Sequence, residues 1–168
     1  YTSLDAGNTG TFGAGWSVIG GRLDADVRGV SFVDATGATL TGLARGSRVI
    51  LDLPDGRRAA FTFAPIALAG GAVNLFRPAW TADDGVGFDL RTADAILTQV
   101  NGVFRFDSTG EVYAPFAVGS AASLSKPDGT RWDYVDGRLA QTRNAAGATV
   151  KWTEAGLVGS VGGRLTFV

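Results

Sequence analysis

Carboxylates are the first side chains in this sequence whose spacing could support chemistry. Asp24 and Asp26 lie two positions apart, so on a strand both would point to the same face. Two carboxyl groups at a defined separation could hydrolyse a glycosidic bond. Asp83, Asp84 and Gly85 form a second acidic group in an expected loop, but neither group has the further oxygen ligands that a Ca²⁺ site needs. Because aspartate is also a common turn residue, we expect turn and strand-edge carboxylates here.

Residue types that are absent narrow the chemistry further. The 168 residues include no histidine, cysteine or methionine, which excludes Ser-His-Asp and Cys-His catalysis and any thiolate metal site. The glycine-rich segment 10–15 is followed by neither a lysine nor a helical pattern, so we interpret it as a tight loop and not a phosphate-binding site. We therefore expect no enzyme activity, no cofactor and no metal.

The charge balance and the apolar runs exclude two kinds of partner. The chain has 15 Lys and Arg residues and 16 Asp and Glu residues, which gives a net charge of −1, so no basic excess exists to neutralise a nucleic-acid backbone. The apolar runs are short and broken by glycine, and no basic amphipathic stretch occurs. We expect no nucleic acid and no membrane insertion.

Aromatic side chains are the one plausible binding feature. Trp16, Trp80, Trp132 and Trp152 could stack on sugar rings if a row of them faced solvent, although a tryptophan in a β protein is buried by default. Trp80 follows the loop-like residues 77–79, which makes it the best candidate for an exposed glycan or partner contact.

Strand and turn signals dominate the chain. Short alternating apolar runs end in Pro-Asp-Gly, Asp-Gly or Ser-Thr-Gly, which are hairpin signals because glycine adopts positive φ at no steric cost. We predict an all-β fold, an antiparallel sheet of repeated hairpins that is a slice of a β-shell or barrel, or an open sandwich. The residues expected to turn the chain are Gly56, Gly110, Gly129 and Gly137, those expected to pack one face are Phe61, Phe63, Trp132 and Tyr134, and Trp16 is expected to anchor the opening segment.

An internal match divides the chain. Segment 29–61 aligns with segment 102–134 without a gap, and the identical positions fall mainly on turn residues, including a shared Pro-Asp-Gly. The two copies should therefore follow the same strand-turn-strand path. We predict an opening segment at 1–28, a first β half at 29–101 and a second at 102–168 that leads into shorter repeats.

Several motifs resemble those of the RHS/YD-repeat proteins. Residues 10–17 (Gly-Thr-Phe-Gly-Ala-Gly-Trp-Ser) are similar to that family's opening motif, and residues 125–134 and 136–139 are similar to the Pro-Asp-Gly…Tyr and Asp-Gly-Arg-Leu of a YD repeat. Residues 64–100 match no motif of the family. Trp152 to Leu157 departs from the standard unit because it lacks the arginine, and the family's self-cleavage motif is absent.

The resemblance implies a function as well as a fold. Members of the family wind long β-sheets into a hollow shell, which encloses a toxic segment in bacterial proteins and serves cell-surface recognition in others. We expect a secreted or cell-surface, non-catalytic module that pairs with the rest of a larger chain or with neighbouring β-chains. The alternatives are a carbohydrate-binding β-module and a subunit of a surface filament built by edge-strand pairing; an enzyme is a third.

Overall fold

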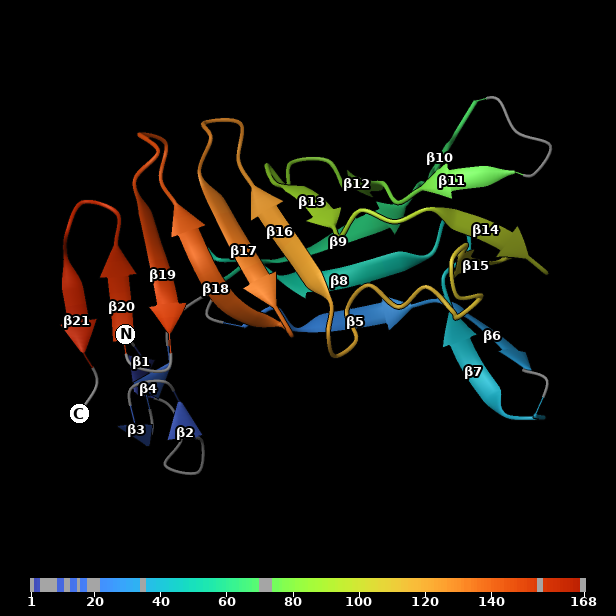
Figure 1. The fold of residues 1–168 in the computed structure, drawn as a ribbon, viewed down its shortest axis with the longest axis horizontal. Helices are drawn as coiled ribbons and strands as arrows, with labels where there is room; N and C mark the ends of the chain where they lie inside the picture. Colours follow the sequence, from blue (N-terminus) through green and yellow to red (C-terminus); the bar gives the residue numbers. More distant parts are fainter. Residues whose placement is uncertain are drawn as a thin grey trace.

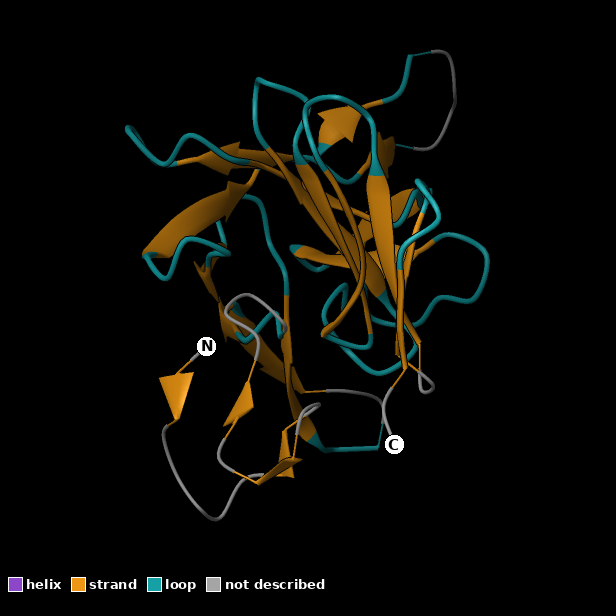
Figure 2. Cartoon of the chain, turned by 90° about the vertical axis from the view of Figure 1, so that its left-hand side faces the viewer, coloured by secondary structure: helices purple, strands orange, loops and turns teal. Residues whose placement is uncertain are grey.

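Strands joined by turns and loops make up the chain. The computed structural model describes residues 22–33, 36–69, 74–153 and 156–166, together with the backbone of residues 2–3, 9–10, 13–14 and 16–17. No helix occurs among the described residues (Figure 2). The prediction of an all-β, antiparallel fold is confirmed, and within this part of the chain the sheets stay open and close into no barrel.

Two main sheets form the body of the molecule (Figure 1). The first contains, in spatial order, β12 (Trp80–Ala82), β9 (Arg58–Phe63), β8 (Arg48–Asp52) and β5 (Ala25–Arg28). The second contains β13 (Asp89–Thr92), β16 (Ala121–Ser125), β17 (Arg131–Val135), β18 (Arg138–Arg143), β19 (Thr149–Thr153), β20 (Gly156–Gly159) and β21 (Arg164–Thr166). In Figure 1 the strands of the second sheet run across those of the first where the two sheets overlap.

Smaller groups of strands extend this body. A third sheet, at the right of Figure 1, contains β10 (Ile66–Ala67), β11 (Leu75–Arg77), β14 (Leu97–Val100) and β15 (Val103–Phe106). The hairpin of β6 (Val30–Val33) and β7 (Thr39–Gly42) projects near it. Two short pairs at the amino-terminal side are β1 (Thr2–Ser3) with β4 (Trp16–Ser17) and β2 (Thr9–Gly10) with β3 (Gly13–Ala14).

Pro-Asp-Gly turns create the two central hairpins. Between β8 and β9, the Asp55 carboxylate accepts a hydrogen bond from the Arg57 amide at 3.1 Å. Between β16 and β17, the Asp128 carboxylate accepts one from the Thr130 amide at 2.8 Å, so the local chemistry is the same. The four glycines expected to turn the chain have positive φ: Gly56 (83°), Gly110 (72°), Gly129 (89°) and Gly137 (68°).

The two central hairpins also share one register. Arg48 lies opposite Thr62 in the first hairpin, and their counterparts in the second, Ala121 and Val135, lie opposite each other as well. Both hairpins have a further antiparallel strand on the same side, β5 beside β8 and β13 beside β16. β5 falls within the opening segment 1–28 of the sequence yet pairs with β8 of the next segment.

The larger hydrophobic cluster lies between these two hairpins. Phe61 of β9 and Tyr134 of β17 occupy equivalent positions and are 0% and 1% exposed. Burying a side chain of this size stabilises the fold by ~1.5–3 kcal/mol. The buried members of this cluster are Leu23, Val49, Leu51, Leu53, Ala59, Phe61, Val86, Phe88, Leu90, Leu124, Tyr134 and Leu139.

A second cluster joins the first main sheet to the third sheet. Phe63 packs edge-on against Phe104, with ring centroids 5.3 Å apart, and both are 0% exposed. The expectation that Phe61, Phe63, Trp132 and Tyr134 pack one face is therefore wrong in part. They point inward from two opposing sheets, and Phe63 belongs to the second cluster. That cluster consists of Leu43, Phe63, Phe76, Leu97, Phe104 and Tyr113.

Candidate functional site

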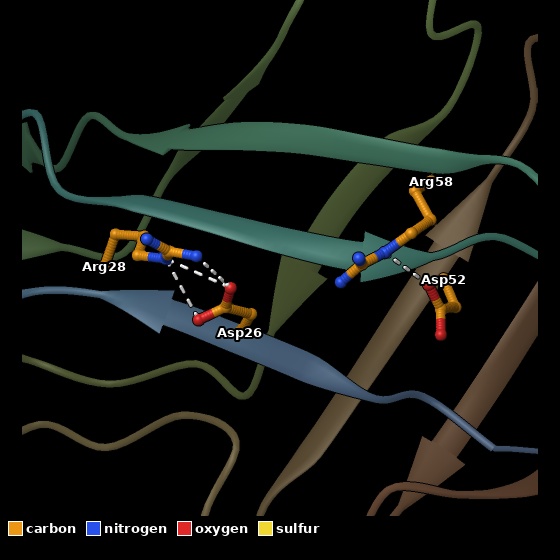
Figure 3. Close-up of polar contacts among 4 residues, drawn as sticks. All are labelled: Asp26, Arg28, Asp52 and Arg58. Atoms are coloured by element: carbon orange, nitrogen blue, oxygen red, sulfur yellow. Dashed lines mark hydrogen bonds and ion pairs between the residues drawn. The ribbon is translucent and has the colours of Figure 1, made fainter.

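The outer face of the first main sheet carries Asp26, one of the carboxylates that the sequence singled out, together with Asp52 (Figure 3). On β5, the Asp26 carboxylate accepts hydrogen bonds from Nε and Nη2 of Arg28, the shortest at 2.7 Å. Between β8 and β9, Asp52 lies opposite Arg58, and Nε of Arg58 is 2.9 Å from Oδ1 of Asp52 without the alignment of a hydrogen bond. The carboxylates on this face are thus neutralised in pairs.

The electrostatics of Asp26 oppose an acid role. The hydrogen bond from Arg28 is the main cause that lowers the pKa of this carboxyl, and the charges of Arg28 and Arg58 act in the same direction. A general acid at neutral pH needs a raised pKa instead. Asp24 precedes β5 and forms its own ion pair with Arg22 at 2.7 Å. The two carboxylates therefore each face an arginine.

The second acidic group also contains a carboxylate that is paired with an arginine. Asp83 forms an ion pair with Arg48, which lies on the same sheet face as Asp52. Asp84 and Gly85 form the turn that follows β12. In the described ranges, no group of three or more histidine, cysteine or acidic residues is placed to hold a metal ion.

Trp80 lies in a different environment from the one expected. It begins strand β12 and is partly buried, so its interpretation as an exposed loop residue is wrong. Its ring centroid lies 5.0 Å from that of Phe63 and 5.6 Å from that of Phe116. The indole Nε1 donates a hydrogen bond to Thr92 Oγ1 at 3.3 Å, and Thr92 in turn shares one with the Tyr113 hydroxyl at 2.7 Å. This environment holds the ring in place and leaves little of its face for a sugar.

The other described tryptophans also pack inward. Trp132 lies 5.6 Å from Phe88, and the ammonium of Lys126 lies 5.7 Å from the centroid of its ring. Trp152 packs against the larger cluster, with its indole nitrogen buried and unpartnered among the described residues. The side chain of Trp16 lies outside the described residues. Trp80, Trp132 and Trp152 therefore do not form an exposed row.

Exposed strand edges were expected from the sequence in general terms, but the β6–β7 hairpin was not singled out as one of them. The hairpin β6–β7 exposes Val33 (67%) and, to a lesser degree, Val30 and Leu40. At the far side of the seven-stranded sheet, Leu165 of β21 is 51% exposed. The signal present in the sequence is a pair of short β-prone runs, Val30–Val33 and Thr39–Gly42, that contain no charged residue.

Comparison with protein-family models, with curated proteins and with solved structures finds no match to the chain. The resemblance to RHS/YD-repeat proteins therefore rests on the motif residues alone. In the described part of the chain, no helix is long and apolar enough to cross a membrane.

Proposed function

We propose that this chain is a non-catalytic structural module of a secreted or cell-surface shell of RHS type, to which it contributes a section of β wall. The observation that carries the proposal is the run from β16 to β21, in which each strand pairs with the next along the chain. The YD-like residues lie in this run: 127–129 turn between β16 and β17, and 136–137 between β17 and β18. Turn chemistry repeated in this way extends a sheet by one strand at a time.

The inner face of the last strands supports the proposal. Trp152, Leu157 and Leu165 lie opposite one another on β19, β20 and β21, so they form an apolar row across three strands. Exposure rises along this row, from partly buried at Trp152 to 51% at Leu165. A sheet whose apolar face continues past its covering layer is suited to a further layer or further strands, supplied by the rest of a larger chain or by a neighbouring β-chain.

A filament built by edge pairing is the second candidate, and the same feature favours it. Within the described residues, β21 pairs on one side only, with β20. A strand with one free edge can pair with another chain. The two functions differ in the partner, which is a continuation of the wall in the first and an identical subunit in the second.

Association through the β21 end tests this proposal. Static light scattering and far-UV circular dichroism of the full chain over a concentration series should show a β spectrum and concentration-dependent assembly. Leu165→Lys should reduce that assembly, because it places a charge in the apolar row. Val161→Lys is the matched control, since Val161 is 86% exposed in the adjacent turn. A soluble monomer at every concentration, or equal assembly by both variants, would overturn the proposal.

A further inference from the structure

The internal match pairs three strands of the first half with strands of the second: β6 with β15, β8 with β16 and β9 with β17. The surroundings of β6 differ from those of β15. In the alignment of segment 29–61 with 102–134, β6 (Val30–Val33) corresponds residue for residue to β15 (Val103–Phe106). β15 is paired on both sides. β14 lies along one edge, and along the other the amides of Phe106 and Tyr113 donate to the carbonyls of Glu111 and Phe104, at 2.9 and 3.0 Å.

β6 lacks the equivalent of β14. In the part of the chain that the structure describes, its one strand partner is β7. At the same offset, β14 falls on residues 24–27, most of which belong to β5. β14 pairs with β15, whereas β5 pairs with β8 and not with β6. Among the described residues, no strand therefore lies along the second edge of β6.

The chemistry of this hairpin leaves the edge unprotected. Neither Val30–Val33 nor Thr39–Gly42 contains a charged residue. Proteins usually protect an exposed edge strand with lysine, proline, a bulge or a covering loop. An isolated two-stranded hairpin is also only marginally stable in water, so a third strand would stabilise it. The exposed side chains are Val30, Ser31, Val33, Thr39, Leu40 and Thr41.

We propose that the free edge of β6 binds β6 of a second copy of this chain, antiparallel and about a two-fold axis. The product is a four-stranded sheet in the order β7, β6, β6 of the partner and β7 of the partner. It would have as many strands as the third sheet, in which β15 is completed within the chain. A two-fold contact places a surface against itself, and an uncharged edge is suited to that because no like charges meet.

The size of the edge sets the strength of this contact. β6 has four residues, so the paired area is smaller than the ~1,000 Å² typical of a stable interface. We therefore expect a weak dimer that forms with rising concentration. It is independent of the shell proposed above, because it uses the β6–β7 hairpin and not the β21 end.

Sedimentation velocity on the full chain tests the dimer. The wild-type chain and Leu165→Lys should both show a monomer–dimer equilibrium. Val33→Lys should weaken it about tenfold, because the symmetric contact places the new charge at the paired edge twice. Val118→Lys, at a loop position that is 96% exposed, is the matched control and should dimerise as the wild type does. Val33 is largely exposed, so its substitution should leave the far-UV spectrum unchanged.

Spin labels locate the contact directly. The chain has no cysteine, so Val33→Cys and Val118→Cys each introduce a single labelling site. Position 33 should give an intermolecular distance within about 20 Å, because paired strands are only ~5 Å apart, and position 118 should give no short distance. Dimers that Val33→Lys leaves intact, or an absence of dimers at every concentration, would overturn the proposal. So would a monomeric chain that binds a peptide with the sequence of β14, since the edge would then accept a different partner.

Discussion

Replacing Phe63 with alanine should remove a large part of the stability of the fold. Its side chain is 0% exposed, and its ring centroid lies 5.0 Å from Trp80, 5.3 Å from Phe104 and 5.7 Å from Tyr113. A Phe→Ala change in a core costs ~3–5 kcal/mol. Three rings lose a neighbour here, and an aromatic pair contributes ~0.5–1.5 kcal/mol beyond buried area. We therefore expect a loss at the upper end of that range, ~4–5 kcal/mol.

Urea unfolding followed by tryptophan fluorescence measures this loss. Trp80 packs against Phe63, so its emission should report on the second cluster. Val118→Ala is the control, since a side chain that is 96% exposed should change the free energy of unfolding by less than ~0.5 kcal/mol. Phe63→Leu should lose less than Phe63→Ala and gives a measurement if the alanine variant does not fold. A loss for Phe63→Ala that falls below the range for buried aromatic residues would refute the placement of this ring at the centre of the cluster.

Three further predictions concern turns, pH and surface charge. Gly129 has a φ of 89°, and the space that a Cβ would fill is open, so Gly129→Ala should lower the free energy of unfolding by ~1–2 kcal/mol through backbone strain alone. Gly163 has open space too, but its φ is not positive, so Gly163→Ala should be nearly neutral in thermal unfolding. Burial raises the pKa of the Tyr113 and Tyr134 hydroxyls well above the usual 10.0. Above pH 10 the folded state therefore binds more protons than the unfolded state, so the free energy of unfolding should fall as pH rises past about 10. Tyrosinate absorbance from these residues should appear only as the chain unfolds. Arg58→Ala should change the free energy of unfolding by less than ~1 kcal/mol, because the side chains of its ion pair with Asp52 are 64% and 49% exposed even though Asp52 Oδ1 itself is buried. A larger loss in urea would contradict that view.

Local chemistry made the hairpins predictable. The Pro-Asp-Gly turns contain their own determinants, since the aspartate binds an amide two residues on and the glycine adopts positive φ. The match between segments 29–61 and 102–134 also found hairpins that share a register, because turn type and turn length fix which residues lie opposite one another.

Long-range packing was not predictable in the same way. Trp80 comes two residues after Pro78 and begins a strand of only three residues, too short for an alternating pattern. Its partners Thr92 and Phe116 are distant in sequence. Of the carboxylates expected in turns and on strand edges, Asp26 lies on the edge strand β5 and Asp84 lies in a turn, whereas Asp24 and Asp83 lie just outside strands. Their arginine partners were not predicted, because a pair such as Arg48 and Asp83 forms only when separate strands meet in one sheet.

The attachment of the segment before β5 bears on the order in which the chain folds. The Leu23 amide donates to the Gly137 carbonyl at 2.7 Å, and Arg22 forms a β-bridge with Arg138, so this segment joins strands made much later in the sequence. Contacts between distant residues require closure of a long loop and form slowly, whereas neighbouring hairpins such as β16 to β21 form from local contacts. We expect the hairpins from β16 to β21 to nucleate folding and the attachment of residues 22–23 to residues 137–138 to form last, so that Leu23 joins the larger cluster only after both halves of the chain have folded.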